Sequence, residues 1–202
     1  GIVAAMWGSS SDWSGGTVWQ SADSGQTWTD IQSFVGGVTC GRAKGLLSAH
    51  AGNLINESET LTVEMRNGQL FGVTEEQMLN GSNVAAYGVN GRWEILRFKN
   101  ATLNPSGSYT LSGFMRGDKG TEWATGLHQA GDELVMLDDP DSAFVGVSSD
   151  LIGASRDYRG ISNGDDIDSD ESLPFVYSGV NLKCLSPVHP AGVRNAGDLT
   201  IT

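Results

Sequence analysis

The chain has 202 residues, of which 39% are hydrophobic and 18% charged, and it contains 28 glycines but only 5 prolines. This composition favours short strands joined by tight turns over long helices, and the length allows one sizeable core or two small ones. The formal net charge of −12 argues against nonspecific binding of nucleic acid or of an anionic membrane surface, because basic patches drive both. No apolar run approaches the roughly 20 residues of a membrane-spanning helix, so membrane insertion is not expected.

Residues 1–70 alternate predicted strands and turns. The first seven residues are apolar and lack the basic flank and cleavage site of a signal peptide, so a strand is expected there. Apolar and polar residues alternate at 61–65, which predicts another strand, and the Asn67-Gly68 pair that follows is a strong hairpin signal. We therefore predict a β-rich N-terminal unit over residues 1–70.

Within this unit, residues 21–28 read Ser-Ala-Asp-Ser-Gly-Gln-Thr-Trp, which matches the Asp-box of sialidase-type β-propellers. The pattern predicts a hairpin turn in which Asp23 accepts backbone N–H bonds, Gly25 takes a positive φ and Trp28 packs under the turn. Ser21 is the first residue of the box. In sialidases the box is a folding element without catalytic chemistry. A propeller repeats it at blade spacing, whereas it occurs once here, so a propeller fragment is kept as an alternative.

The rest of the chain is again predicted to be mainly strands. Thr74-Glu-Glu-Gln77 is a capping box that predicts one short helical turn. Asn90-Gly91 predicts a hairpin with residues 85–87 opposite 93–96. Further strands are expected at residues 109–112, 134–137, 144–147, 173–177 and 182–185. The predicted fold is all-β, with short-stranded β-sandwich or barrel units and one short helix, and the second unit covers residues 71–202.

The most informative stretch is Tyr109–Asp138. It contains an Arg-Gly-x-x-Gly-Thr-Glu turn at residues 116–122, then His128, then Ala-Gly-Asp and an apolar strand that ends in aspartate. This order resembles the C-terminal half of the tail-tip, or host-specificity hub, proteins of siphophages and gene transfer agents. Glu94–Leu103 and Leu79–Asn83 resemble the family's preceding strand and loop. The resemblance runs from about residue 60 to the C-terminus, where the last strand would normally continue past the end of this chain.

The resemblance implies a non-catalytic structural component of a phage or prophage tail tip, located in the virion, with a role in tail assembly and host attachment. It implies other tail proteins as partners, a homotrimer in the full-length protein, and contact with a host receptor or glycan. It implies no cofactor. The loop residues it singles out are Arg116, Gly117, Gly120, Thr121, Glu122 and His128.

Two contacts are expected within this loop region. Arg116 should form a buried or interfacial ion pair with Glu122 or Glu94, because its planar guanidinium suits a bidentate carboxylate contact. The resemblance places His128 in a turn, where we expect its ring to hydrogen-bond backbone. Gly117 and Gly120 would supply backbone conformations that other residues resist.

No catalytic or metal site is predicted. His50, His128 and His189 lack metal-binding spacing, and no serine lies in a hydrolase frame. Nothing favours Glu122 and Asp132 as a glycosidase pair over ordinary turn and strand-edge acids. The two cysteines, Cys40 and Cys184, are far apart in sequence and are expected to be free buried thiols.

Two further patterns have both structural and binding interpretations. Residues 165–171 alternate acidic residues as a calcium loop does, but Glu171 and Tyr177 stand where an EF-hand needs Gly and Glu. Residues 159–172 are therefore expected to be a solvated acidic loop. Four of six tryptophans lie in the first 28 residues, which favours core and hairpin packing, with a carbohydrate-binding module as the alternative. The six are Trp7, Trp13, Trp19, Trp28, Trp93 and Trp123.

Overall fold

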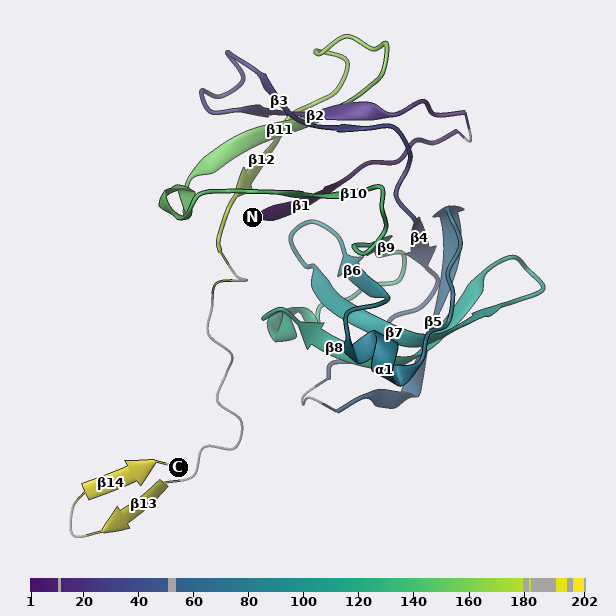
Figure 1. Ribbon diagram of the computed structural model, residues 1–202, viewed down its shortest axis with the longest axis vertical. Helices are drawn as coiled ribbons and strands as arrows, with labels where there is room; N and C mark the ends of the chain where they lie inside the picture. Colours follow the sequence, from purple (N-terminus) through teal and green to yellow (C-terminus); the bar gives the residue numbers. More distant parts are fainter. Residues whose placement is uncertain (11, 51–53, 180–181, 183–191, 196–197, 202) are drawn as a thin grey trace.

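The computed structural model describes residues 1–10, 12–50, 54–179, 182, 192–195 and 198–201. The protein is mainly β, as predicted, and its described part contains one short α-helix (Figure 1). Six strands form a closed barrel, and a four-stranded sheet and a two-stranded sheet lie beside it. A further hairpin pairs β13 (Gly192–Asn195) with β14 (Asp198–Ile201).

The barrel follows the order β4-β5-β8-β7-β6-β9, and every neighbouring pair is antiparallel. Its strands are β4 (Cys40–Ala43), β5 (Asn56–Asn67), β6 (Val84–Gly88), β7 (Glu94–Leu103), β8 (Tyr109–Asp118) and β9 (Glu133–Met136). The first and last of these close the barrel, with Cys40 opposite Val135. Because the barrel is closed, each of the six strands pairs with a neighbour on both sides, and none is an edge strand.

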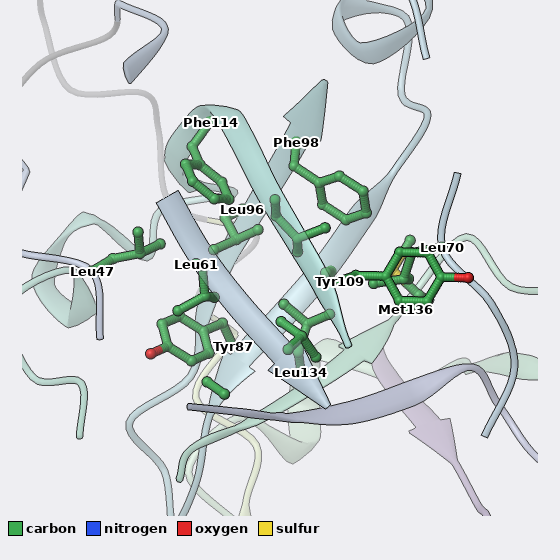
Figure 2. Packing of buried hydrophobic residues seen from close by; sticks show 14 residues of the cluster. Leu47, Leu61, Leu70, Tyr87, Leu96, Phe98, Tyr109, Phe114, Leu134 and Met136 are labelled. Atoms are coloured by element: carbon green, nitrogen blue, oxygen red, sulfur yellow. The ribbon is translucent and has the colours of Figure 1, made fainter. Parts of the chain in front are cut away.

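Period-two alternation along these strands fills the barrel interior with apolar side chains. Phe98 and Phe114 are fully buried there, together with Leu96 from β7 and Leu111 from β8. Figure 2 shows Leu96, Phe98 and Phe114 among the labelled members of the cluster, packed with side chains from other strands of the barrel. The remaining buried members of this cluster are Ala43, Leu47, Leu61, Val63, Leu70, Ala85, Tyr87, Tyr109, Leu134 and Met136. The barrel is a packed core, and its interior is occupied by the protein's own side chains.

Two local predictions in the barrel are confirmed. The Asn90-Gly91 turn joins β6 to β7 with φ values of 52° and 81°, and it places Tyr87 opposite Glu94. Positive φ at both central residues is the requirement of a type I′ turn. Thr74 caps helix α1 (Glu75–Leu79): its hydroxyl accepts from the Gln77 amide, and the Gln77 side chain accepts from the Thr74 amide.

The Asn67-Gly68 signal did not give a hairpin. Strand β5 ends at Asn67, and its neighbours in the barrel are β4 and β8. Gly68 has a φ of 73°, but the chain after it leads to α1 and not back along β5. The Asn67 side chain instead donates to the carbonyl groups of Gly37 and Val38, which draws it toward the segment before β4.

The remaining sheets combine both ends of the chain. Strand β1 (Ile2–Ala5) pairs with β10 (Ser142–Val145). The four-stranded sheet, called the outer sheet below, has the order β12-β11-β2-β3. Its strands are β2 (Gly16–Ser21), β3 (Thr29–Phe34), β11 (Ser155–Ser162) and β12 (Leu173–Val176).

This arrangement corrects the predicted division at residue 70. Strands β4 and β5 precede that residue yet belong to the barrel, while β2 pairs with β11 so that Gln20 lies opposite Tyr158. Pairing between such distant segments leaves no local signal in the sequence. The chain therefore divides into a central barrel segment and an outer sheet made from the segments before and after it.

Some predictions in the C-terminal half need adjustment or fall outside the described residues. Residues 159–162, expected in an acidic loop, belong to β11, and the exposed acidic segment follows them. Cys184 and His189 lie outside the described residues. Cys40 is a buried free thiol, and burial raises its pKa to about 11. No helix in the described part of the chain is long and apolar enough to cross a membrane.

Candidate functional site: a buried ion-pair network

A buried ion pair between Glu94 and Arg116 joins the first residue of β7 to β8. The Arg116 Nε lies 2.7 Å from Glu94 Oε1, and Nη2 lies 2.9 Å from Oε2, so the contact is bidentate. Both side chains are fully buried. Of the two expected partners of Arg116, the structure selects Glu94. Glu122 is exposed, in the short 3-10 helix η1 (Glu122–Ala124).

The remaining hydrogen bonds of Arg116 fasten two loops to the barrel. Nη2 donates to the carbonyl oxygens of Ser48, at 3.2 Å, and Thr125, at 3.3 Å. Nη1 lies 3.5 Å from Glu59 Oε2. Five donors in a fixed fork allow one arginine to hold several chain segments at once.

His128 extends the network from Glu94 to a second carboxylate. Its Nε2 lies 2.6 Å from Glu94 Oε2, and its Nδ1 lies 3.6 Å from Asp132 Oδ2. The ring stacks on Tyr87 with 4.0 Å between centroids and 21° between planes. The expectation of a backbone hydrogen bond for His128 was wrong: its partners are a carboxylate and an aromatic ring, brought together by barrel closure.

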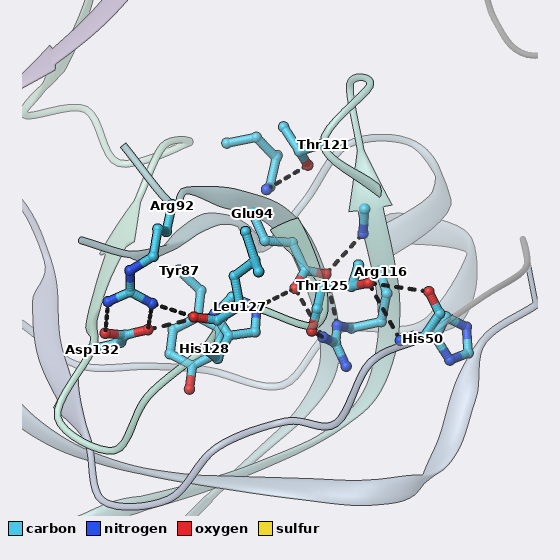
Figure 3. Close-up of polar contacts among 12 residues, drawn as sticks. His50, Tyr87, Arg92, Glu94, Arg116, Thr121, Thr125, Leu127, His128 and Asp132 are labelled. Carbon is cyan, nitrogen blue, oxygen red and sulfur yellow. Dashed lines mark hydrogen bonds and ion pairs between the residues drawn. The ribbon is translucent and has the colours of Figure 1, made fainter. Parts of the chain in front are cut away.

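Asp132 forms the other end of the network. Arg92, from the turn between β6 and β7, donates to both of its oxygens, with Nη2 at 2.9 Å and Nη1 at 3.2 Å. The Gln129 amide also donates to Asp132, and Arg92 donates to the Leu127 carbonyl. Figure 3 shows one continuous row from Arg92 through Asp132, His128 and Glu94 to Arg116.

The electrostatics of this row favour the ionised carboxylates. Burial acts to raise the pKa of Glu94, but hydrogen bonds from His128 and Arg116 outweigh it, so the pKa lies below its usual value. Asp132 behaves likewise, with burial opposed by Arg92 and the Gln129 amide. Two buried carboxylates are thus balanced by two guanidinium groups, which is the condition under which buried charge is tolerated.

The loop after β8 owes its shape to glycines and to Thr121. Gly117 has a φ of 65°, and a Cβ there would approach the Cα of Glu122 to 2.8 Å. Lys119 and Gly120 follow with φ values of 58° and 82°. Thr121 Oγ1 donates to the Asp118 carbonyl at 2.7 Å and accepts from the Ile95 amide at 2.8 Å. The polar turn is therefore held against β7.

The Arg-Gly-Asp tripeptide at residues 116–118 is built into the fold. The Arg116 side chain is fully buried. Asp118 pairs with Arg97 at 2.6 Å, and Arg97 also donates to the carbonyl oxygens of Met78 and Leu79 at the end of α1. The tripeptide fixes the barrel to its only described α-helix and does not present an arginine to a partner.

The Asp-box forms the turn between β2 and β3. Asp23 Oδ1 accepts from the Thr27 amide at 2.9 Å and from the Ser21 hydroxyl at 2.7 Å, and Oδ2 accepts from the Thr27 hydroxyl at 2.7 Å. These bonds, with that of the Thr27 side chain first, lower the pKa of Asp23 to about 2. Gly25 has a φ of 85° and lies against Trp28. Every one of these bonds is internal to the turn.

Four of the tryptophans lie in different surroundings. The Arg159 guanidinium lies 4.3 Å from the Trp28 ring centroid and also pairs with Asp168 at 2.7 Å, which ties the Asp-box to the acidic segment. Trp13 donates to the Ser162 hydroxyl, and Trp7 packs against the cluster around Val38. Trp123 is 53% exposed on η1. Among the described residues, no group of three acidic, histidine or cysteine side chains is placed to hold a metal ion.

Sequence reasoning found Arg116, Glu94 and His128 but missed Arg92, Tyr87 and Thr125. Arg92 directly follows the Asn90-Gly91 turn. That turn predicted where Arg92 lies in the chain's path, but nothing in the sequence indicated that Asp132 would be its partner. Thr125 bridges two loops: its Oγ1 accepts from the His50 amide, and its one hydroxyl hydrogen has the carbonyl oxygens of His50 and Glu122 within reach. These partners come from segments distant in sequence, and only the closed barrel places them together.

The contacts of the buried network are all used within the protein. Both nitrogens of His128 face carboxylates, and arginines bind the oxygens of Glu94 and Asp132. The network therefore holds loops against the barrel.

Comparison with known families adds one finding. Residues 38–135, slightly less than half of the chain, match the model of a family described as Rcc01698-like, C-terminal. No curated protein matches the chain. The matched segment contains β4 to β8 and most of β9, together with all five residues of the buried row, and is therefore similar to that family over the barrel.

Proposed function

We propose that this chain is a non-catalytic structural part of a tail-tip hub of a phage or prophage, located in the virion. The proposal starts from the resemblance of residues 116–122 and His128 to the hub proteins. The contacts that those residues make in the structure support it. Arg116 and His128 are buried in contacts that fasten loops to the barrel, which is the work expected of a load-carrying scaffold.

The packed interior of the barrel agrees with such a role. Small barrels that carry a ligand keep space inside, whereas this one is filled by aromatic and branched side chains. A rigid barrel suits a component that docks neighbouring tail proteins and, in the full-length protein, a trimer of itself. Attachment to a host receptor or glycan would then be carried by surfaces outside the barrel interior.

The gene's neighbours and its flanking coding sequence test this proposal. Tail-tube and tape-measure genes upstream, with a reading frame that continues past Thr202, are expected. A secreted gene standing alone, with repeated Asp-boxes in the flanking sequence, would overturn the proposal in favour of a propeller. As a direct check, an antibody raised against this chain should label one end of purified tails in electron micrographs, and labelling of the capsid or of no particle would contradict it.

A further inference from the structure

A cleft of about 220 Å³ lies beside the outer sheet. Among the residues that line it, the sheet contributes Gln20, Arg156, Tyr158 and Phe175, the segment after β10 contributes Gly146, and Tyr177 follows β12. In Figure 1 that segment runs from β10 toward η2 (Ser149–Leu151), close to β12. Sites for drug-sized ligands usually enclose about 300–1,000 Å³, so this cleft has room for one ring-sized group.

Among the arginines whose side chains the structure describes, Arg156 differs from the others because it has no carboxylate partner. Within the described side chains, six arginines lie within 4.0 Å of an acidic oxygen: Arg42, Arg66, Arg92, Arg97, Arg116 and Arg159. Arg156 has no such ion pair there; it donates to the Ser155 carbonyl at 3.3 Å. Its Nε is buried and has no hydrogen-bond partner among the described residues. The Nε of Arg159 is in the same state, so what sets Arg156 apart is that it is the one charged side chain in the cleft lining and has no described carboxylate beside it, which leaves its guanidinium for an external anion.

Aromatic rings stand next to this guanidinium. Phe175 lies opposite Arg156 in the pairing of β11 with β12, and it is 48% exposed. Tyr158 meets Phe175 edge to face, with 6.1 Å between centroids and 81° between planes. Burial raises the pKa of Tyr158 while the charge of Arg156 opposes that rise, so the phenol and the guanidinium are electrostatic neighbours. The cleft thus offers an apolar face, hydrogen-bonding groups and one cation.

We propose that this cleft binds a sugar residue that carries a carboxylate, such as a hexuronic acid. The carboxylate would pair with the Arg156 guanidinium, whose fork matches two carboxylate oxygens. The ring would lie against Phe175, and Gln20 would take hydroxyl groups through its amide. The proposal does not depend on the proposed function, because it rests on the cleft beside the outer sheet and not on the barrel.

Arg156 is the one charged side chain in the cleft lining, and its charge selects among ligand classes. One guanidinium neutralises a monoanionic carboxylate, whereas a phosphate, which carries up to two charges, would keep excess negative charge beside an acidic protein. A neutral sugar would leave the Arg156 guanidinium without a carboxylate partner. A simple carboxylate such as acetate would satisfy Arg156 but would leave the aromatic face and the Gln20 amide unused.

Titration of the chain with glucuronate, glucose and acetate, followed by NMR chemical shifts, tests the proposal. Glucuronate is expected to bind in the millimolar range, with shifts centred on residues of the cleft, and glucose and acetate at least about tenfold more weakly. Absence of glucuronate binding would overturn the proposal. If glucose bound as tightly as glucuronate, the carboxylate would not contribute to binding. If acetate bound as tightly as glucuronate, the sugar ring would not contribute. Either result would overturn the proposal.

Two variants and a control locate the site. Arg156→Gln should weaken glucuronate binding at least about tenfold, because a charge-assisted hydrogen bond is lost. Lys119→Gln removes one positive charge from an exposed turn outside the cleft and should leave binding unchanged. Gly146→Leu adds a side chain where a Cβ meets nothing within 4 Å, so it should narrow the cleft without strain and also weaken binding. Unchanged affinity in both cleft variants, with their melting temperatures retained, would overturn the assignment.

Discussion

The barrel and the outer sheet are stabilised in different ways. The barrel encloses a large apolar cluster and a fully buried ion pair, so each of its members is removed from water. In the outer sheet, Phe34 and Ile161 are buried, but all four residues of β12 are exposed, and Arg159 lies over a half-buried Trp28. A buried polar contact has a large effect on stability, because forming it stabilises the fold and breaking it leaves an unpaired group away from water. An exposed contact has a small effect, because water can replace the lost partner. The barrel is therefore the sensitive part of the molecule, and the outer sheet is the tolerant part.

The largest expected effect is the loss of the buried arginine. Arg116→Ala leaves the Glu94 carboxylate in the barrel without its bidentate partner, and breaking a buried pair in this way costs about 3–5 kcal/mol of unfolding free energy. Urea unfolding measures it. Arg42→Ala, at a side chain that is 56% exposed, should cost less than about 1 kcal/mol and serves as the control. Both residues belong to the barrel, so this pair isolates burial as the cause, and equal costs for the two variants would contradict the difference between buried and exposed contacts.

Two phenylalanines compare the apolar contacts directly. Phe98→Ala should lower the unfolding free energy by about 3–5 kcal/mol, because it opens a cavity in a core where Phe98 is fully buried. Phe175→Ala removes a side chain that is 48% exposed and should cost less than about 1.5 kcal/mol. Chemical denaturation of both variants gives the two values, and a cost at Phe175 as large as that at Phe98 would contradict the comparison.

Acid should act on the barrel through Glu94 and Asp132. Because the pKa of each is lower in the folded protein than its ordinary value of 4.5 or 3.8, the folded state binds fewer protons than the unfolded state. The stability they contribute is fully present above those ordinary values and is lost as the pH falls through the folded-state values. The unfolding free energy, measured between neutral pH and pH 3, should decline on acidification, and Glu94→Gln should make the decline shallower. An identical slope in Glu94→Gln would exclude Glu94 as a contributor.

The smallest effect is expected in the Asp-box turn. Asp23→Ala removes acceptors used by Thr27 and Ser21, but all of these bonds lie within one exposed turn. We expect faster hydrogen exchange at the amides of residues 24–27 and an unchanged melting temperature for the barrel. Hydrogen exchange by NMR resolves the two regions. Faster exchange in β7 and β8 as well would show that the regions are coupled more tightly than their contacts indicate.

Local signals in the sequence predicted local structure. Asn90-Gly91 gave a hairpin with its register, and Thr74 and Gln77 gave the cap of the short helix, because in each case the whole contact lies within a few residues. Arg116 was expected to pair with one of two carboxylates, because its planar guanidinium suits a bidentate carboxylate contact. Asn67-Gly68 gave the same signal as Asn90-Gly91 but a different outcome, since barrel pairing of β5 with β4 and β8 decided the path of the chain.

Long-range pairing set the remainder of the fold and of the site. His128 meets Glu94 and Tyr87 only because β6 and β7 are neighbours and β9 closes the barrel behind them. The division at residue 70 was wrong for the same reason: β2 finds its partner in β11, beyond the entire barrel segment. Such contacts depend on loop-closure entropy and on the packing of the whole chain. They therefore cannot be predicted from patterns among adjacent residues.

The pairing of Cys40 with Val135 means that the barrel segment begins and ends at the same place. Topologically, the barrel is an insert: the chain leaves the outer sheet, completes the barrel, and returns beside its point of departure. A unit whose entry and exit are adjacent can be transplanted between host frameworks by recombination without stretching either one. The family match at residues 38–135 follows nearly the same two borders.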